Sequence, residues 1–290
     1  MSMPDAGVAP SSAAAALAWA RQRLGAAGVE DAARDARVLL AAARAEAAGP
    51  RTVAAPSELS VAELARFRRL VTGRADRRPV SRLLGRRGFW NIELEIDDAV
   101  LDPRPESETL VEAVLDRIGD RNARLRLLDL GTGSGCLLLA LLGHLTATRG
   151  LGVDLSPAAI ACARTNAGRL GLAGRANFVV GDWGNALGER FDVIVANPPY
   201  IAATEIEDLA PEVSRFEPRL ALDGGPDGLA CYRALAPELK RLLAPGGLGA
   251  LECGQGQAGA VDEILRKARL GNVQTVNDLG GTARCLVFSA

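Results

Sequence analysis

The stretch FDVIVANPPY, Phe191–Tyr200, decides the fold. Its first six residues, Phe191–Ala196, are apolar apart from Asp192 and contain no Gly or Pro, which is typical of a buried strand in a parallel sheet. Pro198 and Pro199 then end the strand, because neither has a backbone N–H to donate to the sheet. We therefore expect this turn at the carboxyl end of a central strand, the edge where open α/β sheets bind ligands.

A glycine-rich loop lies upstream, between a strand predicted at Leu125–Leu130 and a helix predicted at Leu137–Leu145. Its residues are Gly131, Thr132, Gly133, Ser134 and Gly135. Glycines permit a tight turn and a close approach of backbone to ligand, and the following helix N-terminus favours a carboxylate or ribose oxygens. The loop predicts a cofactor site, although NAD- and FAD-binding folds use related loops.

Two acidic residues and a tryptophan follow the next two predicted strands. Asp154 lies at the end of the strand Leu151–Leu155, where a carboxylate can accept hydrogen bonds from both ribose hydroxyls. Asp182 and Trp183 follow the strand Asn177–Val180, where they can meet the amine and the face of an adenine ring. The alternatives are helix caps for the two acids and a core position for Trp183.

Strands and helices alternate from about residue 124 onwards. Helices are predicted from Pro157, over Gly228–Leu243 and over Gly259–Ala268, and further strands over 248–253, 273–276 and 284–289. Repeated βα units predict a doubly wound, mostly parallel sheet, and the last two strands are typical of an antiparallel hairpin at its edge.

Residues 1–85 have helical spacing and predict a small bundle, with a loop at 50–56 and a capping box at Ser60–Glu63. Arginines concentrate late in this bundle, over Arg66–Arg87, as either a solvated basic face or a docking surface for an acidic partner or RNA. Apolar and acidic side chains alternate over 92–96, so residues 86–108 predict a β-hairpin connector that ends in a loop at 101–108.

Composition excludes several classes of function. The 290 residues carry a net charge of -1, so the chain as a whole is not built to wrap nucleic acid. The five cysteines form no Cys-x-x-Cys pair, and His144 is the only histidine, so we expect reduced thiols, no metal site and no Ser-His-Asp triad. No apolar run reaches the ~18 residues of a membrane helix, and the alanine-rich start lacks a basic region, so we expect a cytoplasmic protein.

The order of these motifs resembles that of class I S-adenosylmethionine-dependent methyltransferases, and Asn-Pro-Pro-Tyr resembles the signature of those that methylate planar, amide-like nitrogens. More specifically, the chain resembles the peptide chain release factor N(5)-glutamine methyltransferase family over nearly its whole length. Besides the loop, Asp182-Trp183 and Asn197–Tyr200, the resemblance rests on residues 31–40, Gly88-Phe89-Trp90, 103–112, 216–219 and 224–228.

The resemblance implies a seven-stranded, mostly parallel sheet with a small N-terminal helical bundle. It implies a helical substrate-binding domain at 1–85, a β-hairpin connector at 86–108 and a methyltransferase domain at 109–290. The implied cofactor is S-adenosyl-L-methionine, and the implied substrate is the glutamine of the Gly-Gly-Gln motif in class I release factors. We expect a monomer that binds neither membrane nor, stably, nucleic acid.

The resemblance also implies roles for the four residues of the turn. Asn197, Pro198 and Tyr200 would be catalytic, and Asn197 would lie next to the cofactor as well. All four, with Pro199 included, would bind substrate: the Asn197 side-chain oxygen and the Pro198 carbonyl would accept the two N–H groups of the substrate amide, and Tyr200 would pack on it.

Three alternatives remain open from the residues. A DNA adenine-N6 methyltransferase uses the same turn, but such enzymes need a long basic cleft and usually a recognition domain. A related glutamine methyltransferase acts on a ribosomal protein instead of a release factor. A non-enzymatic NAD- or nucleotide-sensing module would keep the glycine loop and Asp154 but would have no use for Asn197.

Overall fold

The computed structural model describes residues 12–47 and 57–290. The chain divides into two compact units, Met1–Leu84 and Gly85–Ala290. The loop predicted at 50–56 lies outside the described residues.

The first unit is helical, as predicted. Its helices are α1 (Ala13–Ala26), α2 (Ala32–Ala47), α3 (Val61–Ala75) and α4 (Val80–Leu84). Their apolar faces share one core that includes Leu24, Leu39, Phe67 and Val71, all of them fully buried.

The start of α3 is fixed by the predicted capping box. The Ser60 hydroxyl accepts the Glu63 N–H at 3.3 Å, and the Glu63 carboxylate accepts the Ser60 N–H at 2.7 Å. These two bonds satisfy backbone donors that a helix N-terminus otherwise leaves unpaired.

Part of the basic segment Arg66–Arg87 has a structural role. Arg74 is buried and forms an ion pair with Asp35 at 2.7 Å, and Arg82 is buried as well. The Arg77 guanidinium donates to the Gly28 carbonyl at 3.0 Å. The bonds of Arg74 and Arg77 connect α3 to the segment 28–35, and the buried Arg74 and Arg82 do not belong to a solvated face.

The second unit begins with the predicted hairpin, formed by β1 (Arg86–Phe89) and β2 (Ile92–Glu95). Asn166 of the helix α7 (Pro157–Arg169) anchors it, since its side chain accepts the Glu95 N–H at 2.7 Å and donates to the Glu95 carbonyl at 2.9 Å. The hairpin is thereby fixed to the α/β part of this unit.

Within Gly85–Ala290, which the structure describes throughout, the main sheet has seven strands in the order β5-β4-β3-β6-β7-β9-β8. They are β3 (Arg126–Leu130), β4 (Arg149–Asp154), β5 (Ala176–Val180), β6 (Phe191–Ala196), β7 (Leu243–Glu252), β8 (Gly271–Asn277) and β9 (Ala283–Ser289). The first five strands of this order run parallel, and β9 pairs antiparallel with both β7 and β8. This confirms the predicted doubly wound sheet with its antiparallel hairpin.

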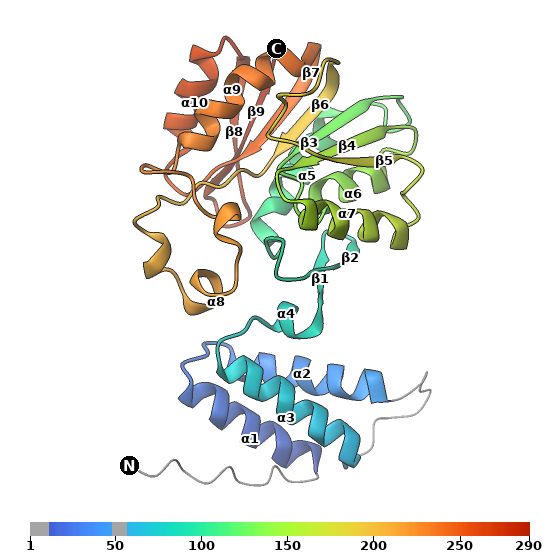
Figure 1. The fold of residues 1–290 in the computed structure, drawn as a ribbon, viewed down its shortest axis with the longest axis vertical. Coiled ribbons are helices and arrows are strands. Elements are labelled where there is room, and N and C mark those ends of the chain that lie inside the picture. The colour runs from blue at the N-terminus through green and yellow to red at the C-terminus, as the bar shows by residue number, and fades with distance from the viewer. Residues whose placement is uncertain (1–11, 48–56) are drawn as a thin grey trace. The chain divides into compact units, whose positions relative to one another are not determined.

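The longer helices cover both faces of the sheet (Figure 1). They are α5 (Glu108–Arg117), α6 (Cys136–His144), α7, α9 (Ala230–Leu242) and α10 (Ala258–Lys267). Leu127 and Val195 point into the core under α5, α6 and α7, whereas Leu128 and Ile194 point into the core under α9 and α10. The two-residue alternation of a strand therefore feeds two cores, which explains why the central strands are apolar on both sides.

Strand β7 is longer than predicted. We expected it to begin at Leu248, but it begins at Leu243, which pairs with Phe191. The ladder shifts register before Val193 pairs with Leu248, so the Pro-Gly-Gly segment forms an irregularity inside the pairing.

The segment between β6 and α9 holds short elements that periodicity did not predict: η2 (Ile206–Asp208), α8 (Pro211–Ser214) and η3 (Arg219–Ala221). Another short turn, η1 (Pro105–Ser107), lies in the connector just before α5. Among the described helices, none combines the length and the apolar character that crossing a bilayer requires.

Candidate active site

The glycine loop links β3 to α6 through three residues with positive φ. Gly131, Gly133 and Gly135 have φ of 77°, 53° and 82°. L-residues with side chains rarely adopt these angles, so the glycines are what allow the strand to turn at once into the helix. Gly135 is the residue that caps α6.

Asp154, the last residue of β4, holds this loop. Its carboxylate accepts the Gly133 N–H at 2.8 Å and the Ser156 N–H at 2.9 Å. Two bonds from backbone donors orient the carboxylate at the open edge of the sheet, beside the loop.

Trp183 packs on the same loop. It follows β5 with a φ of 47°, and a methyl group added to Gly131 would lie 3.4 Å from its ring. Asp182, next to it, is exposed and accepts a hydrogen bond from Asn185 at 3.2 Å.

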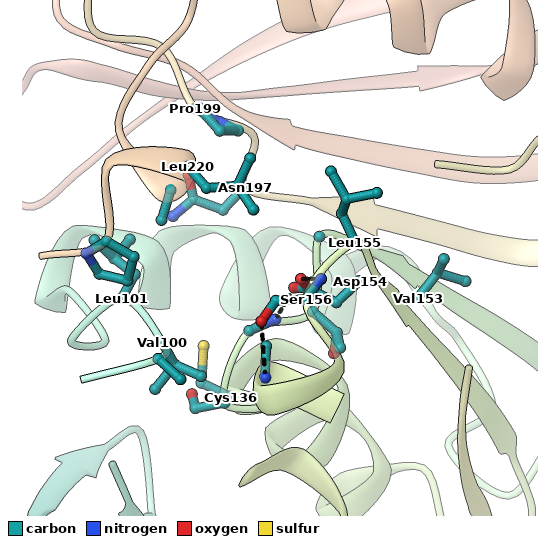
Figure 2. Close-up of a pocket in the computed structure, with 18 of the residues that line it drawn as sticks. Val100, Leu101, Cys136, Val153, Asp154, Leu155, Ser156, Asn197, Pro199 and Leu220 are labelled. Atoms are coloured by element: carbon teal, nitrogen blue, oxygen red, sulfur yellow. Dashed lines mark hydrogen bonds between the residues drawn. The ribbon is translucent and has the colours of Figure 1, made fainter. Parts of the chain in front are cut away.

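A cavity of about 470 Å³ opens at this edge. Its lining includes Gly131, Thr132, Gly133, Ser134, Asp154, Asp182, Trp183, Asn197 and Pro199 among the residues singled out from the sequence. Figure 2 shows Asn197 and Pro199 on one side of it and Asp154 and Ser156 on another. The volume is within the range of roughly 300–1,000 Å³ that is usual for small-molecule sites.

A second cavity, of about 240 Å³, adjoins the first. Tyr200 and Glu252 line it, and Arg104 and Asn197 line both cavities. The Asn-Pro-Pro-Tyr turn therefore stands between two spaces, one beside the glycine loop and one beyond it. Gly135 and Pro198 line neither of the two, and Pro198 is buried.

The Asn197 side chain is held on its nitrogen side. Its Nδ2 donates to the hydroxyl of Ser107 at 3.0 Å, which directs the amide oxygen away from this partner. Ser107 belongs to η1 and is buried. The sequence did not indicate this role for Ser107, because the contact joins the connector to the end of β6, 90 residues further along the chain. No local sequence pattern predicts such a contact.

Two further stretches that carried the family resemblance meet at this site. Arg104 forms an ion pair with Glu217 at 2.7 Å, and Glu217 also accepts the Asp102 N–H at 3.1 Å. The Glu217 side chain is almost fully buried, so the pair fixes the Pro-Arg-Pro-Glu connector against the segment that follows the turn.

Glu252, at the end of β7, is a buried acid that sequence reasoning also missed. Burial raises its pKa to about 7, against the lowering effects of Ser107 and Arg284. The Tyr200 hydroxyl donates to its carboxylate at 3.4 Å, and burial raises the pKa of Tyr200 as well. The signal in the sequence is a lone acidic residue inside the apolar run Leu248–Cys253.

Asp129 is a second buried acid, one residue before the end of β3. Burial raises its pKa from 3.8 to about 7, although a hydrogen bond from the Thr132 hydroxyl at 2.7 Å lowers it. Its bond to Thr132 fixes the end of β3 to the glycine loop.

The single histidine, His144, lies outside the two cavities. It accepts a hydrogen bond from the Trp90 ring N–H at 2.7 Å. In the described part of the chain, no cluster of three or more His, Cys, Asp or Glu side chains could hold a metal ion.

Comparison with known proteins shows which families and folds this chain matches. Residues 121–270 match the methyltransferase domain family, and residues 15–85 match the PrmC N-terminal domain. Two solved structures share the fold: a methyltransferase from Pyrococcus furiosus (TM-score 0.50, 17% identity, 77% of this chain and 97% of that one) and the T. thermophilus 16S rRNA N2 methyltransferase in complex with AdoMet and guanosine (TM-score 0.51, 21% identity, 70% and 49%).

The curated relatives are much more similar to this chain. The release factor glutamine methyltransferase of Caulobacter vibrioides is 47% identical over 90% of this chain and 91% of its own length. Those of Rhodospirillum rubrum and Moorella thermoacetica are 47% and 42% identical, over 93% and 94% of this chain and 82% and 96% of their own lengths. The matched methyltransferase domain and these relatives identify S-adenosyl-L-methionine as the cofactor, and the chain belongs to the release factor glutamine methyltransferase family.

Proposed function

We propose that this protein methylates the side-chain amide nitrogen of a glutamine, and that this glutamine lies in the Gly-Gly-Gln motif of class I peptide chain release factors. One observation carries the proposal: Asn197 lines both cavities, with its nitrogen bonded to Ser107 and its oxygen left to accept. The names of the relatives support the choice of a release factor as substrate.

The larger cavity fits the cofactor. Gly131 and Gly133 line it without side chains, so a ligand can approach their backbone closely. The Asp154 carboxylate would accept hydrogen bonds from the ribose hydroxyls, and the Trp183 ring would stack on adenine. When bound, S-adenosyl-L-methionine supplies an electrophilic methyl group on a positively charged sulfur. The Asp182 carboxylate would accept a hydrogen bond from the adenine amine, and Asn197 would lie next to the methionine end of the cofactor.

The smaller cavity fits a glutamine side chain. An amide nitrogen is a poor nucleophile, because its lone pair is delocalised into the carbonyl. The Asn197 oxygen and the Pro198 carbonyl would accept its two N–H bonds, which aligns the nitrogen and favours the polarised form of the amide. Orientation of this kind and preorganised acceptors supply most of the rate.

Tyr200 and Pro199 would pack on the substrate amide. The Tyr200 hydroxyl stays protonated, because burial raises its pKa, and so it can keep donating to Glu252. The proton released from the substrate nitrogen can leave to water after transfer, so no histidine base is required.

The helical unit would serve the protein substrate. We assign the domains as 1–85 for contact with the release factor, 86–108 for the connector and 109–290 for methyl transfer. We propose further that the protein acts in the cytoplasm as a monomer, without membrane or stable nucleic-acid binding.

The test is methyl transfer from labelled cofactor to an intact class I release factor. The control is the same factor with the Gly-Gly-Gln glutamine replaced by alanine. We expect labelling of the first and none of the second. Labelling of the replaced factor would contradict the target, and transfer to adenine in duplex DNA or to a ribosomal protein in its place would contradict the substrate class.

A further inference from the structure

A site that methylates an amide has to reject carboxylates. Glutamine and glutamate side chains have nearly the same size and shape, but the amide carries two N–H donors, whereas the carboxylate carries only acceptors and a negative charge. A carboxylate oxygen is also the better nucleophile of the two, because the amide lone pair is delocalised. The discrimination therefore has to come from the wall of the cavity that receives the side chain.

The wall of the smaller cavity carries charges of both signs. Four charged side chains line it: Arg104, Glu106, Glu252 and Arg284. Arg104 is ion-paired with Glu217 at 2.7 Å. Arg284 is ion-paired with Asp278 at 3.1 Å. Neither of these two partners lines the cavity, so both arginines are neutralised from outside it, and the charge that remains on the wall is negative.

Of these four side chains, Glu252 is the buried one, with 2% of its surface exposed. The Tyr200 hydroxyl donates to its Oε1 at 3.4 Å, and its Oε2 has no hydrogen-bond partner among the described residues. A buried acceptor without a partner costs free energy, and a ligand that donates a hydrogen bond to it recovers that cost. Solvent screens the exposed charge of Glu106, but it screens a buried charge much less.

Asn197 adds a second acceptor to the same cavity. Its Nδ2 donates to Ser107, which leaves the amide oxygen to accept. Most of the remaining lining is apolar and includes Leu209 and Val213. A carboxamide can donate to these acceptors, whereas a carboxylate would be repelled by Glu252 and would meet arginines that are already paired.

We propose that Glu252 is the specificity-determining residue of the smaller cavity: its buried carboxylate favours a side chain that carries N–H donors and excludes one that carries a negative charge. Glutamine is thereby admitted, and glutamate is rejected. The inference rests on the proposed function, because it concerns the choice of side chain at that same site.

The charge of Glu252 depends on the groups around it. Arg284 favours the carboxylate, whereas burial and Glu106 oppose it, and the pKa lies at about 7. The thiols and hydroxyls packed beside it are uncharged, because burial raises the pKa of each: Cys253, Cys285, Tyr200 and Tyr232. Glu252 is therefore mostly charged at pH 8 and mostly protonated at pH 6.

The experiment measures binding by calorimetry at pH 8, without cofactor so that no methyl transfer occurs. The ligands are an intact class I release factor and two versions of it, in which the glutamine of Gly-Gly-Gln is replaced by glutamate or by alanine. Contacts elsewhere on the factor are the same in all three and cancel. We expect the wild type to bind the glutamine version at least about tenfold more tightly than the glutamate version, the effect of about one charge-assisted hydrogen bond.

Glu252→Gln keeps the shape of the side chain and removes its charge. Because an amide can donate as well as accept, the affinities for the glutamine and glutamate versions should come to within about threefold of each other. Glu112→Gln is the matched control, since it removes an exposed carboxylate of α5 that lines neither cavity, and it should keep the wild-type preference. A Glu252→Gln variant that is folded and keeps the full preference would overturn the proposal.

The alanine version separates this proposal from the proposed function. If the wild type binds the glutamine and glutamate versions equally, and both more tightly than the alanine version, the side chain is recognised but Glu252 does not select it, and the proposal fails. If the wild type binds all three versions equally, the glutamine is not the recognised side chain, and the proposed function fails.

A second measurement uses the wild type alone and needs no substitution in the enzyme. Between pH 8 and pH 6 the protonated fraction of Glu252 rises from about one-tenth to about nine-tenths. A carboxylic acid can donate to a ligand carboxylate, so the affinity for the glutamate version, relative to the alanine version, should rise about tenfold over this range. The same relative affinity at both pH values would overturn the proposal.

Discussion

At the scale of single residues, the site depends on which atom of each polar side chain is already engaged. The side-chain nitrogen of Asn197 donates to Ser107, and this contact does not use the amide oxygen. The two carboxylate oxygens of Asp154 accept the backbone N–H groups of Gly133 and Ser156. Preorganised groups of this kind need no rearrangement when a ligand arrives.

Asn197→Ala removes the acceptor but leaves the proline turn intact. We expect single-turnover methylation to fall by about 10²–10³, the usual cost of losing one preorganised polar contact. Asn197→Asp keeps an acceptor of the same shape and should retain more activity than the alanine variant. Calorimetry should show a much smaller change in cofactor affinity, and a rate equal to wild type for Asn197→Ala would contradict the mechanism.

Asp129 makes stability depend on pH in a direction opposite to that of a paired surface acid. Its pKa is raised to about 7 in the folded state, so between pH 4 and pH 7 the folded chain binds the proton that the unfolded chain has released. Stability therefore falls as the pH rises through this range.

The neutral variant Asp129→Asn should lose this dependence. Its free energy of unfolding, relative to that of the wild type, should be larger at pH 8 than at pH 5 by about 3 kcal/mol, because the wild type loses about 1.4 kcal/mol of stability per pH unit over the roughly two units between pH 5 and the pKa of about 7. Urea denaturation at the two pH values measures the difference, with the exposed Asp116→Asn as the control for charge. A difference that does not change with pH would show that Asp129 is ionised in the fold throughout.

The sequence could predict which local motifs gather at the site, because each follows the end of a predicted strand. Gly131, Asp154, Trp183 and Asn197 come from four strands whose carboxyl ends share one edge, and the structure places all four on one cavity. Their roles stay predictions. Ser107 and Glu252 could not be assigned in this way, because their partners lie far along the chain and only the packed fold brings them together.

At the scale of elements, the antiparallel strand β9 constrains its neighbour β7. Gly249 of β7 lies opposite Phe288 of β9, and the Phe288 ring occupies the space where a side chain at 249 would be. Phe288 is 2% exposed and belongs to the core under α9 and α10, so it has no room to move.

Gly249→Ala should therefore destabilise the second unit by about 3 kcal/mol, the upper end of the usual cost of overpacking. Gly143→Ala in α6 is the matched control, because a methyl group there meets nothing within 4 Å. It should be neutral or stabilising by about 0.5–1 kcal/mol, the usual gain of alanine over glycine in a helix. Thermal or urea unfolding measures both, and equal effects of the two substitutions would contradict this packing.

Element types were predictable and some boundaries were not. The alternation of strand and helix from β3 onwards follows periodicity, and so does the capped start of α3 at Ser60. The start of β7 was not predicted from the sequence. The residues Pro245–Gly247 favour a turn when they are considered alone, but pairing between Leu243 and Phe191 extends the ladder across them. The short turns between β6 and α9 have no period to detect.

At the scale of the whole molecule, each of the two units has its own core. Deleting residues 1–85 should therefore leave cofactor binding intact. Methylation of intact release factor should fall about tenfold or more, equivalent to about 1.4 kcal/mol of lost substrate binding. Calorimetry with cofactor and the labelling assay measure the two properties, and a truncated protein that is folded and works at the full rate would show that the helical unit has another role.

The packing of Trp183 on Gly131 gives the protein an optical signal of its own. The chain has three tryptophans, and of these only Trp183 lines the larger cavity, while Trp19 packs on Phe67 and Trp90 on His144. An adenine ring stacked on its indole would quench or shift the emission of that one fluorophore. A fluorescence titration with cofactor should thus report occupancy in the untagged protein, and Trp183→Phe should abolish the change in signal while the emission of the other two tryptophans persists.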